Sequence, residues 1–297
     1  MSEVLMKNPP VKDPGKTPAI QILKEGKVLL DYGPVTMAIE ARKKGLPCQR
    51  AAVGAARMAV VLLKQVADWL PVVRSPALQV DLHPVYPPVV NAMIAAARAT
   101  GDPQLTPLAA VAGTIAQFCV CKAQSLGADW VVVNNGGDIA LAVPPGGRIR
   151  AGIWNDLTKG TVSHVVEVTR ASGIGGIATS GFGGRSFTLG IASAATVLAG
   201  EAGIADACAT VLGNAVNVDH PAVVRVPART IDPETDIPDL LVTKEIGALP
   251  PEAIARALQN GLSMARDLYE RRLILGAVIS LRGHSVAYPP GIAARYG

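Results

Sequence analysis

Three short segments of the chain carry residues that could do chemistry. In the first, Asn134 to Asp138, two consecutive glycines precede a carboxylate. Glycine lets a backbone approach a ligand closely, and Asp138 can accept hydrogen bonds from hydroxyls or from a ring N–H. The same letters also fit a tight β-turn with an aspartate cap. The segment thus predicts either a plain turn or a ligand site lined by Asn135, Gly136 and Gly137 with Asp138.

The second segment, Gly176 to Arg185, mixes glycines with hydroxyl side chains. Backbone N–H groups and hydroxyls in such a segment can form a concave anion site, and Thr179, Ser180 and Gly181 lie at its centre. Arg185 adds a fixed positive charge that suits phosphate or carboxylate. The segment lacks the spacing and the Lys-Ser/Thr ending of a P-loop. Its alternative interpretation is a flexible glycine loop.

The third segment is Ala205 to Thr210. Asp206 and Thr210 are four residues apart, so they share one face of a helix. A carboxylate and a hydroxyl one turn apart can hold a hard divalent cation, with waters and backbone carbonyls completing the shell. The alternative is that Asp206 caps a helix predicted over residues 204–216.

Together and in this order, the three segments resemble the ApbE superfamily of FAD:protein FMN transferases. The resemblance implies an α+β, T-fold-related fold in which helices pack on one face of an antiparallel sheet. It implies Asp206 and Thr210 as magnesium ligands, and a nucleotide site lined by Thr179, Ser180 and Gly181.

A more specific resemblance is to an uncharacterised ApbE-like group. Its hallmarks run from about residue 33 to 284 and include Pro107–Gly113, the Asn-Gly-Gly-Asp form of the first segment, and Ser186–Gly190. This implies that Ala112 and Gly113 also contact the ligand. Relatives in this group have been linked to sulfur assimilation and homocysteine formation. Cys208 favours such thiol handling, although it also fits a small buried residue.

The sequence departs from the flavin transferases in one respect. They follow Thr-Ser-Gly with a His-Ile-x-Asp-Pro segment, and residues 182–199 contain no such histidine. Aromatic residues make up 4% of the chain, so few rings can stack on a flavin. We therefore expect no stoichiometric FAD and no flavinylated protein acceptor.

The resulting functional hypothesis is an enzyme that acts on a small or nucleotide-like anionic ligand with a divalent metal, by transfer or hydrolysis. Arg185, Asp138 and His220 are its candidate catalytic residues. His220 is chosen because it adjoins Asp219 and histidine is the usual acid–base group near neutrality, but it also fits a turn histidine. Two alternatives are an accessory protein of sulfur assimilation and a hydrolase that opens a small heterocycle.

Apolar periodicity predicts the elements that position these residues. A β-hairpin is expected over residues 20–30. The segment 173–190 is expected to be a glycine-rich stretch. The predicted domains are a tail over residues 1–17 and a single domain over 18–297. Helices are expected over 48–70, 84–100, 106–126, 204–216 and 252–269, and single strands over 35–41, 130–133, 139–143, 149–153, 163–169 and 273–281.

The composition limits the class of protein and the kinds of partner that this chain can have. Of 297 residues, 49% are apolar and 17% charged, which is typical of a globular chain with an Ala/Val-rich core. The net charge of +5 is scattered, and no basic stripe interleaves with aromatics, which argues against nucleic acid. Four cysteines form no CxxC pair, and no segment reads as a signal or membrane span, so we expect a cytoplasmic protein. The expected partner is a small molecule, and a homo-oligomer is left open.

Overall fold

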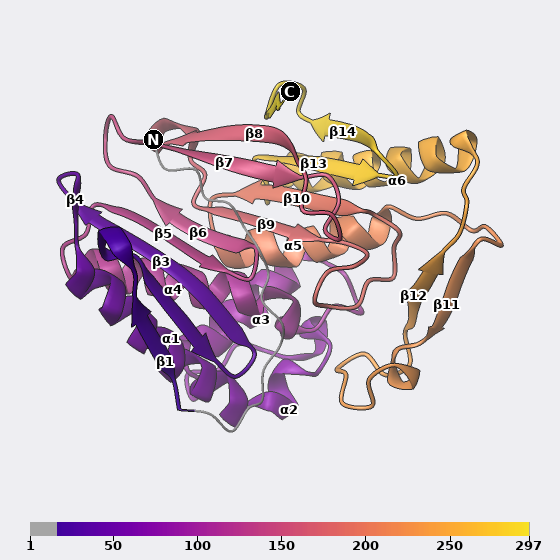
Figure 1. The fold of residues 1–297 in the computed structure, drawn as a ribbon. Coiled ribbons are helices and arrows are strands. Elements are labelled where there is room, and N and C mark those ends of the chain that lie inside the picture. The colour runs from indigo at the N-terminus through magenta and orange to yellow at the C-terminus, as the bar shows by residue number, and fades with distance from the viewer. Residues whose placement is uncertain (1–16, 297) are drawn as a thin grey trace.

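The computed structural model describes residues 17–296 (Figure 1). Apart from Thr17, the predicted tail lies outside the described residues. Mixed α/β structure with antiparallel sheets and helices is confirmed. The relation to T-folds stays an expectation. None of the helices in residues 17–296 is long and apolar enough to cross a membrane.

The centre of the molecule is an antiparallel sheet whose strands follow one another almost in chain order. Its order is β1-β2-β3-β5-β6-β9-β10-β13-β14, with β4 paired to β3. The strands are β1 (Ala19–Ile22), β2 (Val28–Tyr32), β3 (Val35–Lys43), β4 (Leu46–Pro47), β5 (Trp130–Asn135), β6 (Asp138–Ala142), β9 (Gly176–Ser180), β10 (Ala194–Ala199), β13 (Gly276–Leu281) and β14 (His284–Tyr288).

Helices cover one face of this sheet (Figure 1). The first half of the sheet packs on α1, α3 and α4 through one apolar core, and the second half packs on α5 and α6 through another. The helices are α1 (Gln49–Asp68), α2 (Leu70–Val73), α3 (Pro88–Thr100), α4 (Val111–Ser125), α5 (Ala202–Ala215) and α6 (Pro251–Glu270). Short 3-10 helices occupy Lys24–Gly26, Ala77–Gln79, Pro107–Ala110, Arg170–Ser172 and Ala228–Thr230.

A small second sheet covers part of the other face. It has the order β15-β8-β7 and consists of β7 (Arg148–Trp154), β8 (Val162–Thr169) and β15 (Ala294–Arg295). Alternate residues of β7, such as Ile149 and Ile153, are buried against apolar residues of the central sheet. The chain therefore forms three layers: helices, central sheet and small sheet.

Helices α4 and α5 cross very closely, because glycines stand at the crossing. A Cβ atom on Gly113 would lie 2.1 Å from the carbonyl oxygen of Ala202, and one on Gly203 would lie 2.5 Å from the Thr114 hydroxyl. A Cβ on Gly176 of β9 would lie 2.3 Å from the Ala202 Cα. The start of α5 thus lies directly against both α4 and β9.

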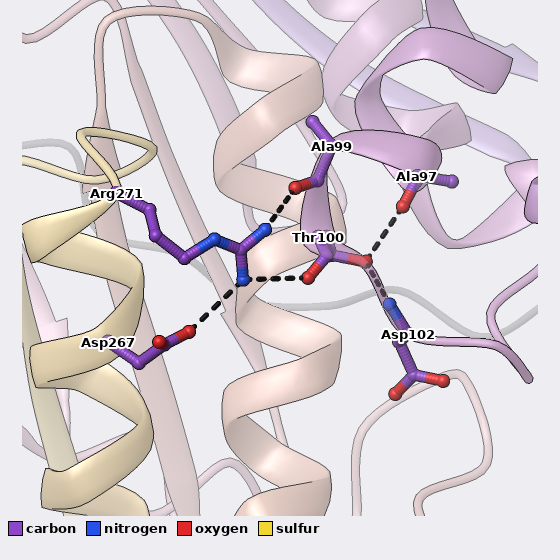
Figure 2. Close-up of polar contacts among 6 residues, drawn as sticks. All are labelled: Ala97, Ala99, Thr100, Asp102, Asp267 and Arg271. Atoms are coloured by element: carbon purple, nitrogen blue, oxygen red, sulfur yellow. Dashed lines mark hydrogen bonds and ion pairs between the residues drawn. The ribbon is translucent and has the colours of Figure 1, made fainter.

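Helix α3 is tied to α6 at its C-terminal end (Figure 2). The Arg271 guanidinium donates to the carbonyl oxygens of Thr100 and Ala99 at 2.9 and 2.6 Å and pairs with Asp267 at 3.1 Å. The Thr100 hydroxyl accepts the backbone N–H of Asp102 at 3.2 Å. A cation on the last carbonyls of a helix satisfies them and complements the helix dipole.

Several strands of the structure were not predicted from the sequence. The glycine-rich stretch contains β9, whose register pairs it with both β6 and β10. It has no period-2 pattern because Gly176, Ile177 and Ala178 are all buried in the middle layer. The strands β10, β11 (Val223–Pro227), β12 (Leu241–Ile246) and β14 were also not predicted. In Figure 1, β11 and β12 form a two-stranded ribbon at one side of the molecule.

Candidate functional site

The three sequence segments meet at one cleft of about 350 Å³. The turn between β5 and β6 brings Asp138, the end of β9 brings Thr179, and α5 brings Asp206, and all three line the cleft. They come from positions up to 68 residues apart in the chain, which the antiparallel β6–β9 pairing and the close α5–β9 contact bring together. The predicted convergence is therefore confirmed, while the chemical roles of the residues stay predictions.

Asp206 is anchored from a neighbouring helix. Helix α5 begins at Ala202 and its N-cap residue is Glu201, so the interpretation of Asp206 as a cap is wrong. Instead, its Oδ2 accepts the backbone N–H of Gly113 in α4 at 2.8 Å. The missing Gly113 side chain allows this approach. The Thr210 hydroxyl, one turn further, donates to the Asp206 carbonyl oxygen at 3.3 Å, which leaves its own oxygen able to accept or to bind a cation.

Asp138 and Asp206 both line the cleft, close enough for the charge of one to act on the other. Burial raises the pKa of Asp138 to about 7, against the lowering effects of the Thr179 N–H, 3.4 Å from its Oδ1, and of the Arg185 charge. Burial, and next the charge of Asp138, raises the pKa of Asp206 well above its ordinary value. Two carboxylates so placed repel each other when both are ionised. The site therefore favours a proton or a cation between them.

The raised pKa of Asp138 predicts a pH-dependent stability. An unfolded aspartate loses its proton near pH 4, whereas folded Asp138 keeps it until about pH 7. The folded state is thus favoured below pH 4, and this contribution is lost as the pH rises from 4 to 7. Because Asp138 is only half-buried, we discount the full linkage to about 1–3 kcal/mol.

Thermal melts of the metal-free protein across this range measure the effect. Asp138→Asn should melt like the unmodified protein at pH 4 and above it at pH 8. Asp219→Asn, at an exposed loop position, is the matched control. An equally steep loss in Asp138→Asn would contradict the assignment.

Arg185 stands at the rim of the cleft. Its Nη2 donates to the Pro34 carbonyl oxygen, and its Nη1 lies 2.8 Å from where a Cβ on Gly136 would be. Gly136 and Gly137 have φ angles of 68° and 115°, which favour glycine, and the Gly137 N–H donates to Asn134 Oδ1 at 2.9 Å. The tight turn is therefore present, and its residues line the cleft beside Arg185, while ligand binding by this segment stays a prediction.

The remaining predicted residues divide into lining and supporting ones. Those that line the cleft are Ala112, Asn135, Gly136, Gly137, Thr179, Ser180, Gly181, Arg185 and Thr210. Asn135 Nδ2 donates to the Ala112 carbonyl oxygen at 3.1 Å, and the Thr179 hydroxyl pairs with the Thr196 hydroxyl at 2.8 Å. Gly113 is buried behind Asp206, so its place is in support of the site.

The structure does not bring His220 to the cleft. It follows α5 in a turn, its Nδ1 accepts the Ala222 N–H at 3.1 Å, and it lines neither this cleft nor the adjoining one. A turn histidine, the alternative reading, describes its position. Adjacency to Asp219 in sequence gave no information on its distance from Asp206.

One side of the cleft is lined by apolar residues, which the sequence analysis did not predict. The residues of this wall are Trp154 at the end of β7, Leu157 in the β7–β8 connection, Val35 of β3, Leu63 of α1 and Ile115 of α4. Apolar residues in regular elements carry no motif, and no signal in the sequence separates them from core residues. They give the cleft an apolar side opposite its polar floor, as ligand sites usually have.

A second cleft of about 540 Å³ adjoins the first. The two share Asp138, Arg185, Asp206 and Thr210 as lining residues. The outer part of the second cleft is lined by Arg74, Gln104, Asn214 and residues of the 232–237 loop. The acidic floor is therefore reached from two sides.

The donors present fit a divalent cation bound in the manner of magnesium. In residues 17–296 no group of three or more His, Cys, Asp or Glu side chains is placed to hold a metal. Two carboxylates and the Thr210 hydroxyl are available, and Mg²⁺ is commonly held by one or two carboxylates while waters and substrate oxygens complete its shell. Such an ion would offset the repulsion between Asp138 and Asp206.

Cys208 does not suit thiol chemistry. Its side chain is fully buried in the apolar core between α5 and the sheet, and burial raises the pKa of the thiol to about 12. The reactive form of cysteine is the thiolate. Cys208 therefore serves as a small core residue.

Curated relatives match about half of the chain. A protein named UPF0280 from Methanothrix thermoacetophila is 39% identical over 148 residues, 48% of this chain and 61% of that protein. UPF0280 proteins from Methanosarcina barkeri and Methanothermobacter thermautotrophicus are 36% and 34% identical, over 50% and 48% of this chain and 58% and 56% of theirs. The chain thus spans about three fifths of the length of these relatives.

Two solved structures were also similar. Flavin transferase ApbE from Vibrio cholerae gives a TM-score of 0.42 at 12% identity, covering 93% of this chain and 98% of that one. Apo flavinyl transferase ApbE from Pseudomonas stutzeri gives 0.34 at 15% identity, covering 62% and 50%. The family model described as AbpE bacteria matches residues 20–287. The ApbE-like resemblance is confirmed, and the chain belongs to this family.

Proposed function

We propose that this chain is a transferase that acts on a small or nucleotide-like anionic ligand with the help of a divalent cation. One observation carries the proposal: Asp138 and Asp206 meet in a cleft with Thr210 and Arg185. A cation held by the two carboxylates and the hydroxyl would polarise a phosphoryl or carbonyl oxygen. Arg185 would bind the anionic group and stabilise negative charge that develops on it.

The two adjoining clefts favour transfer over hydrolysis. A hydrolase needs room for one ligand and a water, whereas a transferase must bring donor and acceptor to the same reactive groups. Here Asp138, Asp206, Thr210 and the rim residue Arg185 line both clefts, of about 350 and 540 Å³. We assign the donor to the first cleft, where backbone and hydroxyl groups from Thr179 to Gly181 support an anion, and the acceptor to the second.

Bound flavin is not part of the proposal. In residues 17–296, Trp154 and Phe187 are the aromatic side chains that line the two clefts, so a flavin ring would find one ring in each. The resemblance to flavin transferases keeps FAD as a candidate donor that is consumed. Neither sulfur handling nor ring-opening hydrolysis is proposed, because Cys208 lies in the core and the paired clefts favour an acceptor.

Manganese titration tests the proposal. Mn²⁺ is added to the protein with and without ADP, and the free ion is followed by electron paramagnetic resonance. We expect one ion per chain, and each ligand should strengthen the binding of the other, because coupling between two sites is reciprocal. No saturable Mn²⁺ binding in either sample would overturn the proposal.

A further inference from the structure

A separate basic groove lies away from both clefts. It has a volume of about 1220 Å³ and runs along the small sheet where that sheet meets the ends of β3 and β5. We define it by its cations and its two carboxylates. The cations are Arg42, Lys44, Arg148, Arg150 and Arg295, and the carboxylates are Asp129 and Glu167.

Five cations and two carboxylates line the groove, and one of these cations, Arg42, is already paired with the Glu40 carboxylate at 2.6 Å. Arg148 lies 3.8 Å from Glu167, and the two side chains are 70% and 51% exposed. Exposed pairs of this kind contribute little and do not fix either side chain. The field also reaches the small sheet itself, because burial and next the Arg295 charge lower the pKa of His164. An anionic partner would therefore meet a net positive surface.

The groove also presents the edge of a strand. Within the described residues, β7 pairs only with β8, so its other edge is open. Gly147 and the β7 residues Arg148, Ile149 and Arg150 line the groove, together with residues of β8 and β15. Arg148 and Arg150 are alternate residues of one strand and so lie roughly 7 Å apart on one side. Alternate side chains of any extended peptide have the same spacing.

We propose that the basic groove binds an extended acidic segment of a partner protein, added as a strand along β7. Main-chain hydrogen bonds to the open edge would supply binding energy, and carboxylates at alternate positions would pair with Arg148 and Arg150. A long open edge is otherwise a hazard that native proteins cover or block with charge. This inference does not depend on the proposed function, and its binding can be measured without any metal.

Strand β7 runs from the groove to the candidate site. The strand passes from Arg148 and Arg150 in the groove to Gly152 and Trp154, which line the first cleft. Six residues of extended chain span roughly 20 Å. A segment bound on this edge would therefore be directed to the mouth of the cleft.

A peptide fits the groove better than a nucleic acid strand does. Single-stranded nucleic acid is bound by rings on which successive bases stack. The groove contains Trp130 and Tyr296, and the Arg42 guanidinium already lies over the Trp130 ring, 5.4 Å from its centre. An open strand edge offers nothing specific to a sugar–phosphate backbone, whereas it matches a polypeptide directly.

The test uses a fluorescein-labelled peptide of about ten alternating Glu and Thr residues, long enough to cover β7 when extended. Fluorescence anisotropy on the full chain follows its binding. We expect saturable binding that weakens with salt, and no binding of a matching Lys-Thr peptide. The double variant Arg148→Gln/Arg150→Gln should bind the acidic peptide at least tenfold more weakly than the unmodified chain does.

The control removes the same charge elsewhere. Arg57→Gln/Arg256→Gln changes two exposed arginines on α1 and α6, outside the groove, and should bind the peptide as the unmodified chain does. Thermal melts confirm that each variant is folded. Equal weakening by both double variants, or a single-stranded oligothymidine that binds while the acidic peptide does not, would overturn the proposal.

Discussion

Asp206→Asn should lose divalent-ion affinity by at least tenfold and, in the same protein, raise the melting temperature of the metal-free form at pH 8. The first effect follows from the loss of a charged oxygen. Mutating a residue that only hydrogen-bonds to a metal ligand already lowers metal affinity roughly 10–100-fold. Asparagine can still accept the Gly113 N–H, so the fold around α4 and α5 is kept. The two effects have opposite signs, which a merely structural role would not produce.

The stability effect follows from the raised pKa of Asp206, which burial and next Asp138 cause. A folded carboxyl with a raised pKa favours the folded state below its ordinary pKa and loses that contribution as the pH rises. Asparagine removes this loss, so the gain should be absent near pH 4 and grow above it.

Mn²⁺ titration and thermal melts at pH 4 and pH 8 measure both effects. Asp219→Asn, an exposed position outside both clefts, is the matched control and should change neither. Unchanged Mn²⁺ affinity in folded Asp206→Asn would exclude Asp206 as a ligand. A variant that melts lower at pH 8 would contradict the burial of an unfavourable charge.

Gly113→Ala should destabilise the fold by about 3 kcal/mol or more, at the upper end of overpacking effects. The new Cβ would lie 2.1 Å from the Ala202 carbonyl oxygen and 2.9 Å from the Asp206 Cβ. A backbone atom cannot rotate away, so α5 must move from α4. That movement would break the Gly113–Asp206 hydrogen bond and weaken Mn²⁺ binding as well.

Gly54→Ala is the comparison, because it makes the same change inside another helix, α1. Its Cβ would meet the Leu126 side chain, with Cδ1 at 2.3 Å and Cγ at 3.8 Å, and this side chain can rotate away. Alanine gains about 1 kcal/mol over glycine in helix interiors, so this variant should be near neutral. Urea unfolding at 25 °C gives both values. Similar losses in the two variants would show that the α4–α5 crossing tolerates a side chain.

What could be predicted from the sequence was local. The four-residue spacing of Asp206 and Thr210 predicted a shared helical face, and both residues do line the cleft. The start of the helix was placed two residues late, at 204, and this error is what made the cap interpretation of Asp206 available. An N-cap depends on one hydrogen bond, which sequence pattern places only to within a residue or two.

Features built from distant segments could not be predicted. The basic residues appeared scattered along the chain, yet the fold collects those of β3, the turn after it, β7 and β15 into one groove. The apolar wall around Trp154 is equally non-local. His220 illustrates the converse, since a local signal beside Asp219 placed it in a site that the chain path does not reach.

The Arg271 contact to Thr100 and Ala99 joins residues 171 and 172 positions apart. The central sheet, by contrast, adds its strands nearly in chain order. During synthesis the first strands, α1, α3 and α4 can therefore assemble as soon as they leave the ribosome, since domains form from the N-terminus onward. The last carbonyls of α3 gain the Arg271 cation only when α6 is complete. A ribosome stalled before residue 251 would hold a largely formed first core with the end of α3 still hydrated, and translation of α6 would join the end of α3 to the second half of the fold before β13 and β14 complete the sheet.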